Sequence, residues 1–299
     1  MTEPIRLPAA GMLNALDLTA VGAEAGIDRF QGPSVSMPHG RVFGGQVLAQ
    51  SILAAMRTVD ESRVIHSIHG YFLRPGDDQL PIDFGVDRIH DGRSFSTRRA
   101  QAYQHGKPIL SLIASFQTED EGLDHQASMP EGLPEPESLP GIAEQLASLN
   151  SELATRAISA AAFDLRHVPS RVGADGAAPP IQAVWMKSLA DLPDDPNLHR
   201  AALAYGSDYT LLEPVLRRHG IPWLTEGLKI ASLDHAMWWH RFARADDWLL
   251  YVQESPSASG GRGLAVGRMF TRDGVLVASV AQEGMIRLPQ FAHDAQGLA

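Results

Sequence analysis

Asp208 is the acidic residue whose place in the sequence most needs an explanation. It precedes the apolar residues Leu211 and Leu212 by three and four positions, and on a helix this spacing directs a carboxylate toward the core. A buried carboxylate has a raised pKa and can act as a base. The alternative is local, because Ser207 or Asp208 could cap the helix by accepting a bond from a backbone N–H.

A serine and a glutamine recur at equal spacing in the two halves of the chain. Ser67 and Gln117 are 50 residues apart, and so are Ser232 and Gln282. The residues that flank the two pairs are also similar. Equal spacing of similar segments, within the same order of elements, predicts an internal duplication.

The two halves differ in the carboxylate. The duplication offset is 165 residues, and it places Phe43 opposite Asp208. We therefore expect one site per chain, in the second half, with the first half as scaffold. Asp234 is a rival carboxylate, because in a strand it would share a face with Ser232 two residues away.

One helix and four strands are expected in the first half. The helix begins near Gly44-Gly45, because apolar residues then recur on one of its faces. The strands end at turns that contain Gly or Pro, and they span Val64–Leu73, Ile82–Ile89, Ser94–Tyr103 and Ile109–Gln117. Their short connections favour an antiparallel meander over parallel crossovers.

The second half repeats this order of elements. An apolar stripe over residues 211–216 predicts a helix that ends at His219-Gly220. The strands expected after it span Leu228–Trp239, Trp248–Glu254, Leu264–Thr271 and Val275–Gln282, with a hairpin turn at Arg272-Asp273-Gly274.

The chain is therefore expected to contain two α+β units. Residues 1–118 form the N-terminal unit, which lacks the carboxylate, and residues 156–299 form the C-terminal unit, which has it. Residues 119–155 are expected to form a linker and a connecting helix. The Pro, Gly and acidic residues between Glu119 and Gly141 indicate the linker.

Composition excludes several classes of function. The chain has 35 acidic and 25 basic residues, and its net charge of -10 disfavours nucleic-acid binding. It contains no cysteine, which excludes a thiol nucleophile, and the histidine spacings predict no metal site, so no metal or other cofactor is expected. No apolar run approaches the roughly 20 residues of a transmembrane helix. No targeting signal is recognised, so the expected location is the cytoplasm.

Six arginines are available for a polyphosphate ligand if the fold gathers them: Arg93, Arg98, Arg99, Arg241, Arg262 and Arg268.

Several separated segments resemble the acyl-CoA thioesterase II (TesB-type) family, whose members contain two hotdog domains in one chain. The similar segments of the first half are Arg41-Val42-Phe43-Gly44-Gly45-Gln46, Tyr71-Phe72-Leu73-Arg74-Pro75-Gly76 and Asp91-Gly92-Arg93-Ser94-Phe95-Ser96. Those of the second half include Ser207-Asp208, Leu233-Asp234-His235, Ser255-Pro256-Ser257-Ala258-Ser259 and Gln282-Glu283-Gly284. The resemblance covers roughly residues 25–290, and it is weak from the linker to about Pro196.

This resemblance implies a double hotdog fold and the hydrolysis of fatty acyl-CoA to a fatty acid and CoA. It also implies that Asp208, Ser232 and Gln282 position the attacking water. Asp208 would act as the general base or, alternatively, as a nucleophile that forms an acyl-enzyme anhydride. Acyl-CoA is the expected partner, and a homodimer or larger homo-oligomer is expected because such sheets leave a long edge exposed.

The backbone N–H groups of Gly44 and Gly45 are expected to form an oxyanion hole, since the first turn of a helix presents unpaired donors. The alternative is that these glycines only permit close packing of the helix against the sheet. Asp234 is expected to support the site. A non-catalytic acyl-CoA-binding hotdog protein and a hotdog enoyl-CoA hydratase are the alternative functions.

Overall fold

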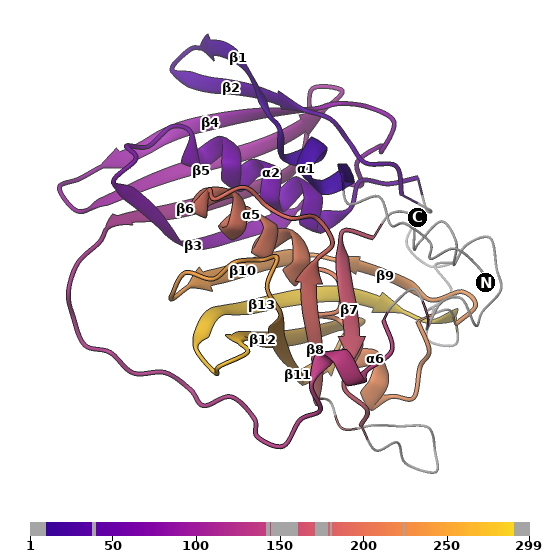
Figure 1. Cartoon of the computed structure of the whole chain (residues 1–299). Helices are drawn as coiled ribbons and strands as arrows, with labels where there is room; N and C mark the ends of the chain where they lie inside the picture. The colour runs from indigo at the N-terminus through magenta and orange to yellow at the C-terminus, as the bar shows by residue number, and fades with distance from the viewer. Residues whose placement is uncertain are drawn as a thin grey trace, which may run out of the picture.

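The computed structural model describes residues 10–37, 40–141, 144, 161–170, 179, 181–223 and 225–289. Two α+β units stack against each other around a central pair of helices, α2 (Gly44–Met56) and α5 (Pro196–Ser207) (Figure 1). The strands of the first unit lie on one side of this pair, and those of the second unit lie on the other (Figure 1).

The first unit contains the helix and the four strands that its sequence predicts. Its elements are α1 (Ala10–Leu16), β1 (Thr19–Glu24), β2 (Ile27–Gly32), α2, β3 (Arg63–Phe72), β4 (Ile82–Asp91), β5 (Phe95–Gln104) and β6 (Lys107–Thr118). Helix α1 and the hairpin of β1 and β2 are additional elements, which the apolar pattern does not indicate.

The second unit confirms the expected strands but not the expected main helix. Its elements are β7 (Phe163–His167), β8 (Ile181–Ser188), α5, α6 (Glu213–Arg218), β9 (Lys229–Ser232), β10 (Asp234–Trp239), β11 (Leu249–Ser259), β12 (Arg262–Thr271) and β13 (Leu276–Arg287). The stripe at residues 211–216 contributes only to the short α6. The helix that packs against α2 is α5, whose buried residues include small ones, namely Ala201, Ala202, Ala204, Gly206 and Ser207. Small side chains give a weak apolar signal, although they allow the closest approach of two helices.

Thirteen strands of the described residues form one sheet, and every pair of neighbours in it is antiparallel. Their order is β1-β2-β4-β5-β6-β3-β10-β13-β12-β11-β8-β7, and β9 also pairs with β13. The two units join where β3 pairs with β10, for example at Ile68 and Met237. Strand β3 pairs with β6 and not with β4, so the expected meander holds only for β4, β5 and β6.

Helices α2 and α5 pack antiparallel to each other. A Cβ atom at Gly45, in the first turn of α2, would lie 2.3 Å from the carbonyl oxygen of Tyr205, near the end of α5. Residues 45–56 of α2 are all buried. The first turn of α2 therefore lies beside the last turn of α5, at the boundary between the two units.

The linker runs along the second unit without helix or strand until a short 3-10 helix at Pro136–Ser138. The Gln126 side chain donates to the Gly274 carbonyl (2.8 Å) and accepts from the Leu276 N–H (3.1 Å), which fastens the linker to the β12–β13 turn. The predicted connecting helix lies mostly outside the described residues.

No helix in the described part of the chain is long and apolar enough to cross a membrane.

Candidate active site

Asp208 lies at the boundary between the units, where it forms the C-cap of α5. The Ser232 hydroxyl, at the end of β9, donates to Asp208 Oδ1 (3.1 Å), and Gln282 Nε2, on β13, donates to the same oxygen (2.9 Å). The Gly45 N–H, from α2 of the other unit, also donates to the carboxylate. Gln282 Nε2 lies 2.6 Å from Ser232 Oγ. The structure therefore brings all three predicted residues into one hydrogen-bonded network.

Helix capping does not explain Asp208. Helix α6 begins after its N-cap Leu212, which makes no side-chain cap hydrogen bond. Asp208 instead closes α5, at a helix end where carbonyl groups give a carboxylate no stabilisation. Ser207 Oγ donates within its own helix, to the Ala204 carbonyl (2.8 Å), or to His235. The buried orientation of Asp208 follows from the end of α5 and not from the apolar stripe of α6.

A one-residue shift in strand pairing aims Ser232 and Gln282 at the same point. Ser232 pairs with Gly284 of β13, whereas Ala236 pairs with Ala281. Three residues on one strand therefore lie opposite two on the other. Such a bulge redirects side chains and is common beside active sites.

Burial raises the pKa of Asp208 from 3.8 to about 6, while the hydrogen bonds from Gln282, Ser232 and the Gly45 N–H oppose that rise. Protein atoms pack around the carboxylate, yet the residue keeps partial solvent accessibility. At neutral pH the group is mostly ionised, and it is basic enough to accept a proton from water.

Gly44 and Gly45 let α2 approach α5 and its carboxylate. A Cβ at position 44 would lie 2.5 Å from Asp208 Oδ2, and one at position 45 would meet the Tyr205 carbonyl. These glycines therefore permit close packing against helix α5 and not, as expected, against the sheet, and the oxyanion role of their N–H groups stays a prediction. The Gly45 N–H is directed at Asp208, and the positive end of α2 stabilises this carboxylate.

Asp234 does not share a face with Ser232, and that prediction is wrong. Along β10 the buried positions are 235, 237 and 239, so Asp234 lies on the opposite face of the strand. Its Oδ1 accepts from the Glu283 N–H (2.7 Å) and holds β10 to β13. The bulge after Ser232 breaks the two-residue alternation on which the expectation rested.

His235 is a polar residue of this region that the sequence reasoning did not select. It is 1% exposed. Its Nδ1 lies 2.5 Å from Gln282 Oε1, and its Nε2 lies 2.9 Å from Ser207 Oγ. It lies three positions after Ser232, a spacing that puts two side chains on opposite faces of a regular strand. Only the bulge turns both toward Gln282.

Among the described residues of the first unit, no glutamine takes the place that Gln282 has in the second. Strand β3 has its own one-residue shift, between Ile65 and Ser67, and Phe116 pairs with Ile65 beside it. Phe116 is fully buried, as Gln282 is. Gln117, which the 50-residue spacing matches to Gln282, follows Phe116 and so faces the other side of the sheet.

Phe43 is not the counterpart of Asp208 either. It is the N-cap of α2, and its ring lies 5.2 Å from that of Tyr205 and 4.7 Å from that of Tyr209. The residue that closes α2, as Asp208 closes α5, is Arg57. The fixed sequence offset fails here because the connections after α2 and α5 differ in length.

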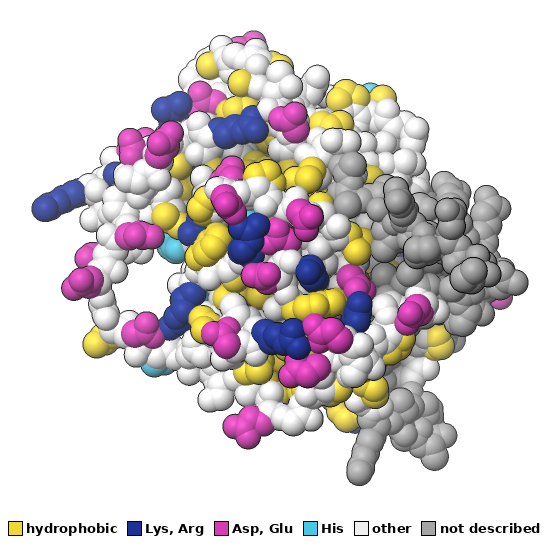
Figure 2. Space-filling model, in the orientation of Figure 1, with side chains coloured by type: hydrophobic (Ala, Val, Ile, Leu, Met, Phe, Trp, Pro, Cys, Tyr) yellow, Lys and Arg dark blue, Asp and Glu magenta, His cyan; other side chains and the backbone are white. Residues whose placement is uncertain are grey.

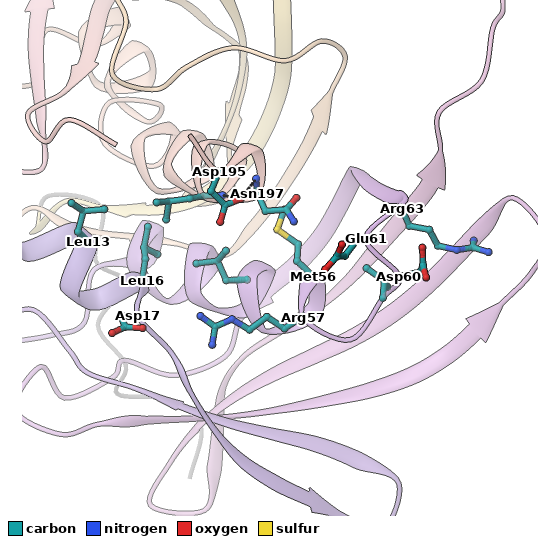
Figure 3. Close-up of a pocket in the computed structure, with 13 residues that line it drawn as sticks. Leu13, Leu16, Asp17, Met56, Arg57, Asp60, Glu61, Arg63, Asp195 and Asn197 are labelled. Carbon is teal, nitrogen blue, oxygen red and sulfur yellow. Dashed lines mark hydrogen bonds between the residues drawn. The ribbon is translucent and has the colours of Figure 1, made fainter. Parts of the chain in front are cut away.

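A cavity of about 480 Å³ lies at the opposite end of the helix pair (Figure 3). It is lined by the end of α2, including Met56 and Arg57, and by the start of α5, including Asp195 and Asn197. The network around Asp208 does not line it. The network lies where α2 begins and α5 ends, and the cavity lies where α5 begins and α2 ends. The two are therefore at corresponding positions of the duplicated units.

Five of the six arginines form salt bridges with carboxylates: Arg98 with Asp91, Arg99 with Asp87, Arg241 with Asp124, Arg262 with Glu283 and Arg268 with Glu254. Figure 2 shows basic and acidic side chains interspersed over one face of the molecule.

Within the described ranges, no three His, Asp or Glu side chains lie close enough together to hold a metal ion.

Both halves match known families. A family model described as acyl-CoA thioesterase matches residues 158–285, and one described as the acyl-CoA thioesterase N-terminal domain matches residues 33–117. Acyl-CoA thioesterase 2 of Haemophilus influenzae is 38% identical over 269 residues, which cover 87% of this chain and 93% of that protein.

Solved structures agree with these matches. The crystal structure of the acyl-CoA thioesterase II TesB2 from Mycobacterium marinum is 44% identical, with a TM-score of 0.76 over 94% of this chain and 99% of that one. A hot dog fold protein from Alicyclobacillus acidocaldarius, 19% identical, shares the fold with a TM-score of 0.74 over 93% and 98% of the two chains. The fold is a double hotdog, and the chain belongs to the acyl-CoA thioesterase family.

Proposed function

We propose that this thioesterase hydrolyses fatty acyl-CoA with a water molecule that Asp208 deprotonates. The observation that carries the proposal is the convergence of Ser232, Gln282 and the Gly45 N–H on one carboxylate. A base with a pKa of about 6 is largely ionised at neutral pH and still accepts a proton readily. Positioned general bases typically accelerate such steps by about 10²–10⁴-fold.

The chemistry follows from this arrangement. Water attacks the thioester carbonyl as its proton passes to Asp208, and a tetrahedral intermediate forms. The C–S bond then breaks, and the CoA sulfur leaves as a thiolate that takes up the proton. Ser232 and Gln282 hold Oδ1 in place. The other oxygen, Oδ2, lies next to Gly44, whose lack of a side chain leaves room there, and it is the oxygen that faces the water.

The two glycines then have different roles. The Gly45 N–H holds the carboxylate, which leaves the Gly44 N–H as the proposed donor to the carbonyl oxygen in the transition state. A substitution at Gly45 does not test this role, because a side chain there would collide with the Tyr205 backbone.

The test measures thiol release from a panel of acyl-CoAs, from short to long chains, by the wild type and by Asp208→Asn. We expect release by the wild type and nearly none by the variant. A protein that binds acyl-CoA without releasing thiol would be a binding protein, and formation of a 3-hydroxyacyl-CoA from an enoyl-CoA would identify a hydratase. The panel also measures the chain-length preference.

A labelling experiment detects a nucleophilic Asp208 whose anhydride is opened at the aspartyl carbonyl. With excess enzyme in H₂¹⁸O, a single turnover through a general base places the label in the fatty acid. An acyl-enzyme anhydride at Asp208, opened by water at the aspartyl carbonyl, places it in the protein. We expect label in the fatty acid.

We also propose that the chain self-associates. Exposed apolar side chains lie on the face of the sheet opposite α2, namely Tyr71, Phe95 and Ile113, and a second copy would cover them. Sedimentation equilibrium should give at least twice the 32.3 kDa mass of the chain.

A further inference from the structure

Gln282 fits its proposed role in only one orientation of its amide. With Nε2 toward the network, it donates to Asp208 Oδ1 and approaches Ser232 Oγ. Rotation by 180° would place Oε1 against the carboxylate oxygen, where two acceptors repel each other. The two ends of the amide have nearly the same size, so shape alone does not select between them. Asp208 favours one orientation, and a hydrogen-bond donor group at the other end of the amide would reinforce that preference.

His235 is that group. Its Nδ1 lies 2.5 Å from Gln282 Oε1, and its Nε2 lies 2.9 Å from Ser207 Oγ. Burial lowers the pKa of His235 to about 4, so the neutral ring carries one N–H at neutral pH. Because Oε1 is only an acceptor, that hydrogen lies on Nδ1, and Nε2 is an acceptor for the Ser207 hydroxyl, which it shares with the Ala204 carbonyl.

We propose that His235 is a positioning residue, whose Nδ1–H holds Gln282 Oε1 so that the amide nitrogen stays on Asp208 and Ser232. The proposal rests on the role of Gln282 in the proposed function. The chain of contacts runs from the last turn of α5, through Ser207, His235 and Gln282, back to Asp208 directly after that turn. These contacts fix the orientation of the His235 ring and of the Gln282 amide between Ser207 and Asp208.

Two substitutions of His235 separate its two hydrogen bonds. In His235→Asn the amide nitrogen can take the place of Nδ1 and donate to Gln282. In His235→Gln the longer side chain reaches the place of Nε2 near Ser207 and leaves Oε1 without its donor. Each variant keeps one hydrogen bond and loses the other, so both should lose similar thermal stability.

Their activities should differ. We expect kcat within about threefold of the wild type for His235→Asn. For His235→Gln we expect a loss of roughly 10- to 100-fold in kcat with little change in KM, by analogy with the loss of a group that orients a metal-ligating side chain. Equal kcat for the two variants, whether high or low, would show that His235 has only a structural role.

A double-mutant cycle keeps this inference distinct from the proposed function. If His235 acts through Gln282, His235→Gln causes no further loss of kcat in a Gln282→Ala background. An equal further loss in that background would overturn the inference. Unchanged kcat in Gln282→Ala alone would instead overturn the proposed role of Gln282.

The wild type provides a test that does not depend on folding of any variant. Nitrogen-15 NMR of labelled histidine should show the His235 ring with a protonated Nδ1 and an unprotonated Nε2 at pH 7. The opposite tautomer would contradict the proposal, because Nδ1 would then have no hydrogen to donate to Gln282.

Discussion

Asp195 and Asp208 lie at opposite ends of α5, and each carboxylate accepts hydrogen bonds from the first turn of a helix. Asp195 is the N-cap of α5 itself and accepts from the N–H groups of Asn197 and Leu198. Asp208 accepts from the first turn of α2, in the other unit. Local sequence is enough to form the first arrangement, whereas the second exists only when both units are folded together. A carboxylate held across the unit boundary is the one that meets Ser232 and Gln282.

The two helix ends are also closed by different groups. The Arg98 side chain is 2% exposed at the end of α2 and donates to Thr58 Oγ1, the carbonyls of Thr58, His90 and Thr97, and the Asp91 carboxylate. These bonds use all five guanidinium N–H donors. At the end of α5, the Tyr251 hydroxyl donates to the Ser207 carbonyl (3.1 Å). The first unit thus satisfies its helix end internally, while the second places there the carboxylate that we propose as the catalytic base.

The largest expected difference between the two ends is catalytic. Asp208→Asn should lower kcat on the order of 10³-fold, because the base is lost. Asp195→Asn is the matched control, and it should leave both kcat and stability nearly unchanged, since Asn caps a helix about as well as Asp. Steady-state thiol release and thermal unfolding measure both effects. Comparable losses of kcat in the two variants would contradict a single site.

The free energy of unfolding should fall more when the end of α2 loses its side-chain partner than when the end of α5 does. Arg98→Met should lower the free energy of unfolding by about 3 kcal/mol, because it leaves buried acceptors without donors. Tyr251→Phe removes a neutral hydroxyl, which bonds the Ser207 carbonyl and the Gln253 side chain, and should cost about 1 kcal/mol. Urea denaturation gives both values. Folded Arg98→Met should keep the wild-type kcat, and a large loss of kcat would mean that the first unit does more than support the site.

The pH dependence should follow Asp208. Since its pKa is raised to about 6, kcat/KM should fall below about pH 6 as the carboxylate becomes protonated. The folded pKa exceeds the unfolded value, so the protonated group stabilises the fold at low pH, and this contribution is lost as the pH rises through about 6. Between pH 5 and pH 7.5, the stability of the wild type relative to Asp208→Asn should therefore fall by about 1 kcal/mol. A pH-independent difference would show that Asp208 does not titrate in this range.

The smallest expected effect tests whether a carboxylate alone makes a site. Arg57→Asp, added to Asp208→Asn, places an acidic residue at the end of α2. We expect no recovery of thiol release, because Phe116 stands where Gln282 would be needed. Phe43→Asp in the same background should fail as well. Measurable recovery in either double variant would mean that the first unit retains a latent site.

Patterns over short stretches predicted most of the strands and the helix that begins at Gly44. The approximate duplication was also evident, because similar segments recur at one spacing. The prediction that Asp208, Ser232 and Gln282 meet came from a family resemblance, and the structure brings these three side chains together. The main helix of the second unit escaped the apolar pattern because small residues form much of its buried surface.

The sequence by itself determined two similar α+β units, a carboxylate at the position of Asp208 in only one of them, and no cysteine for covalent chemistry. Side-chain type and spacing suffice for such features, since they depend on local periodicity. Tertiary structure decided that α2 supplies an N–H to the Asp208 of the other unit, that Asp234 faces away from Ser232, and that His235 faces Gln282. These contacts depend on the pairing of β3 with β10 and on a one-residue bulge, and strand alternation read from the sequence contains neither.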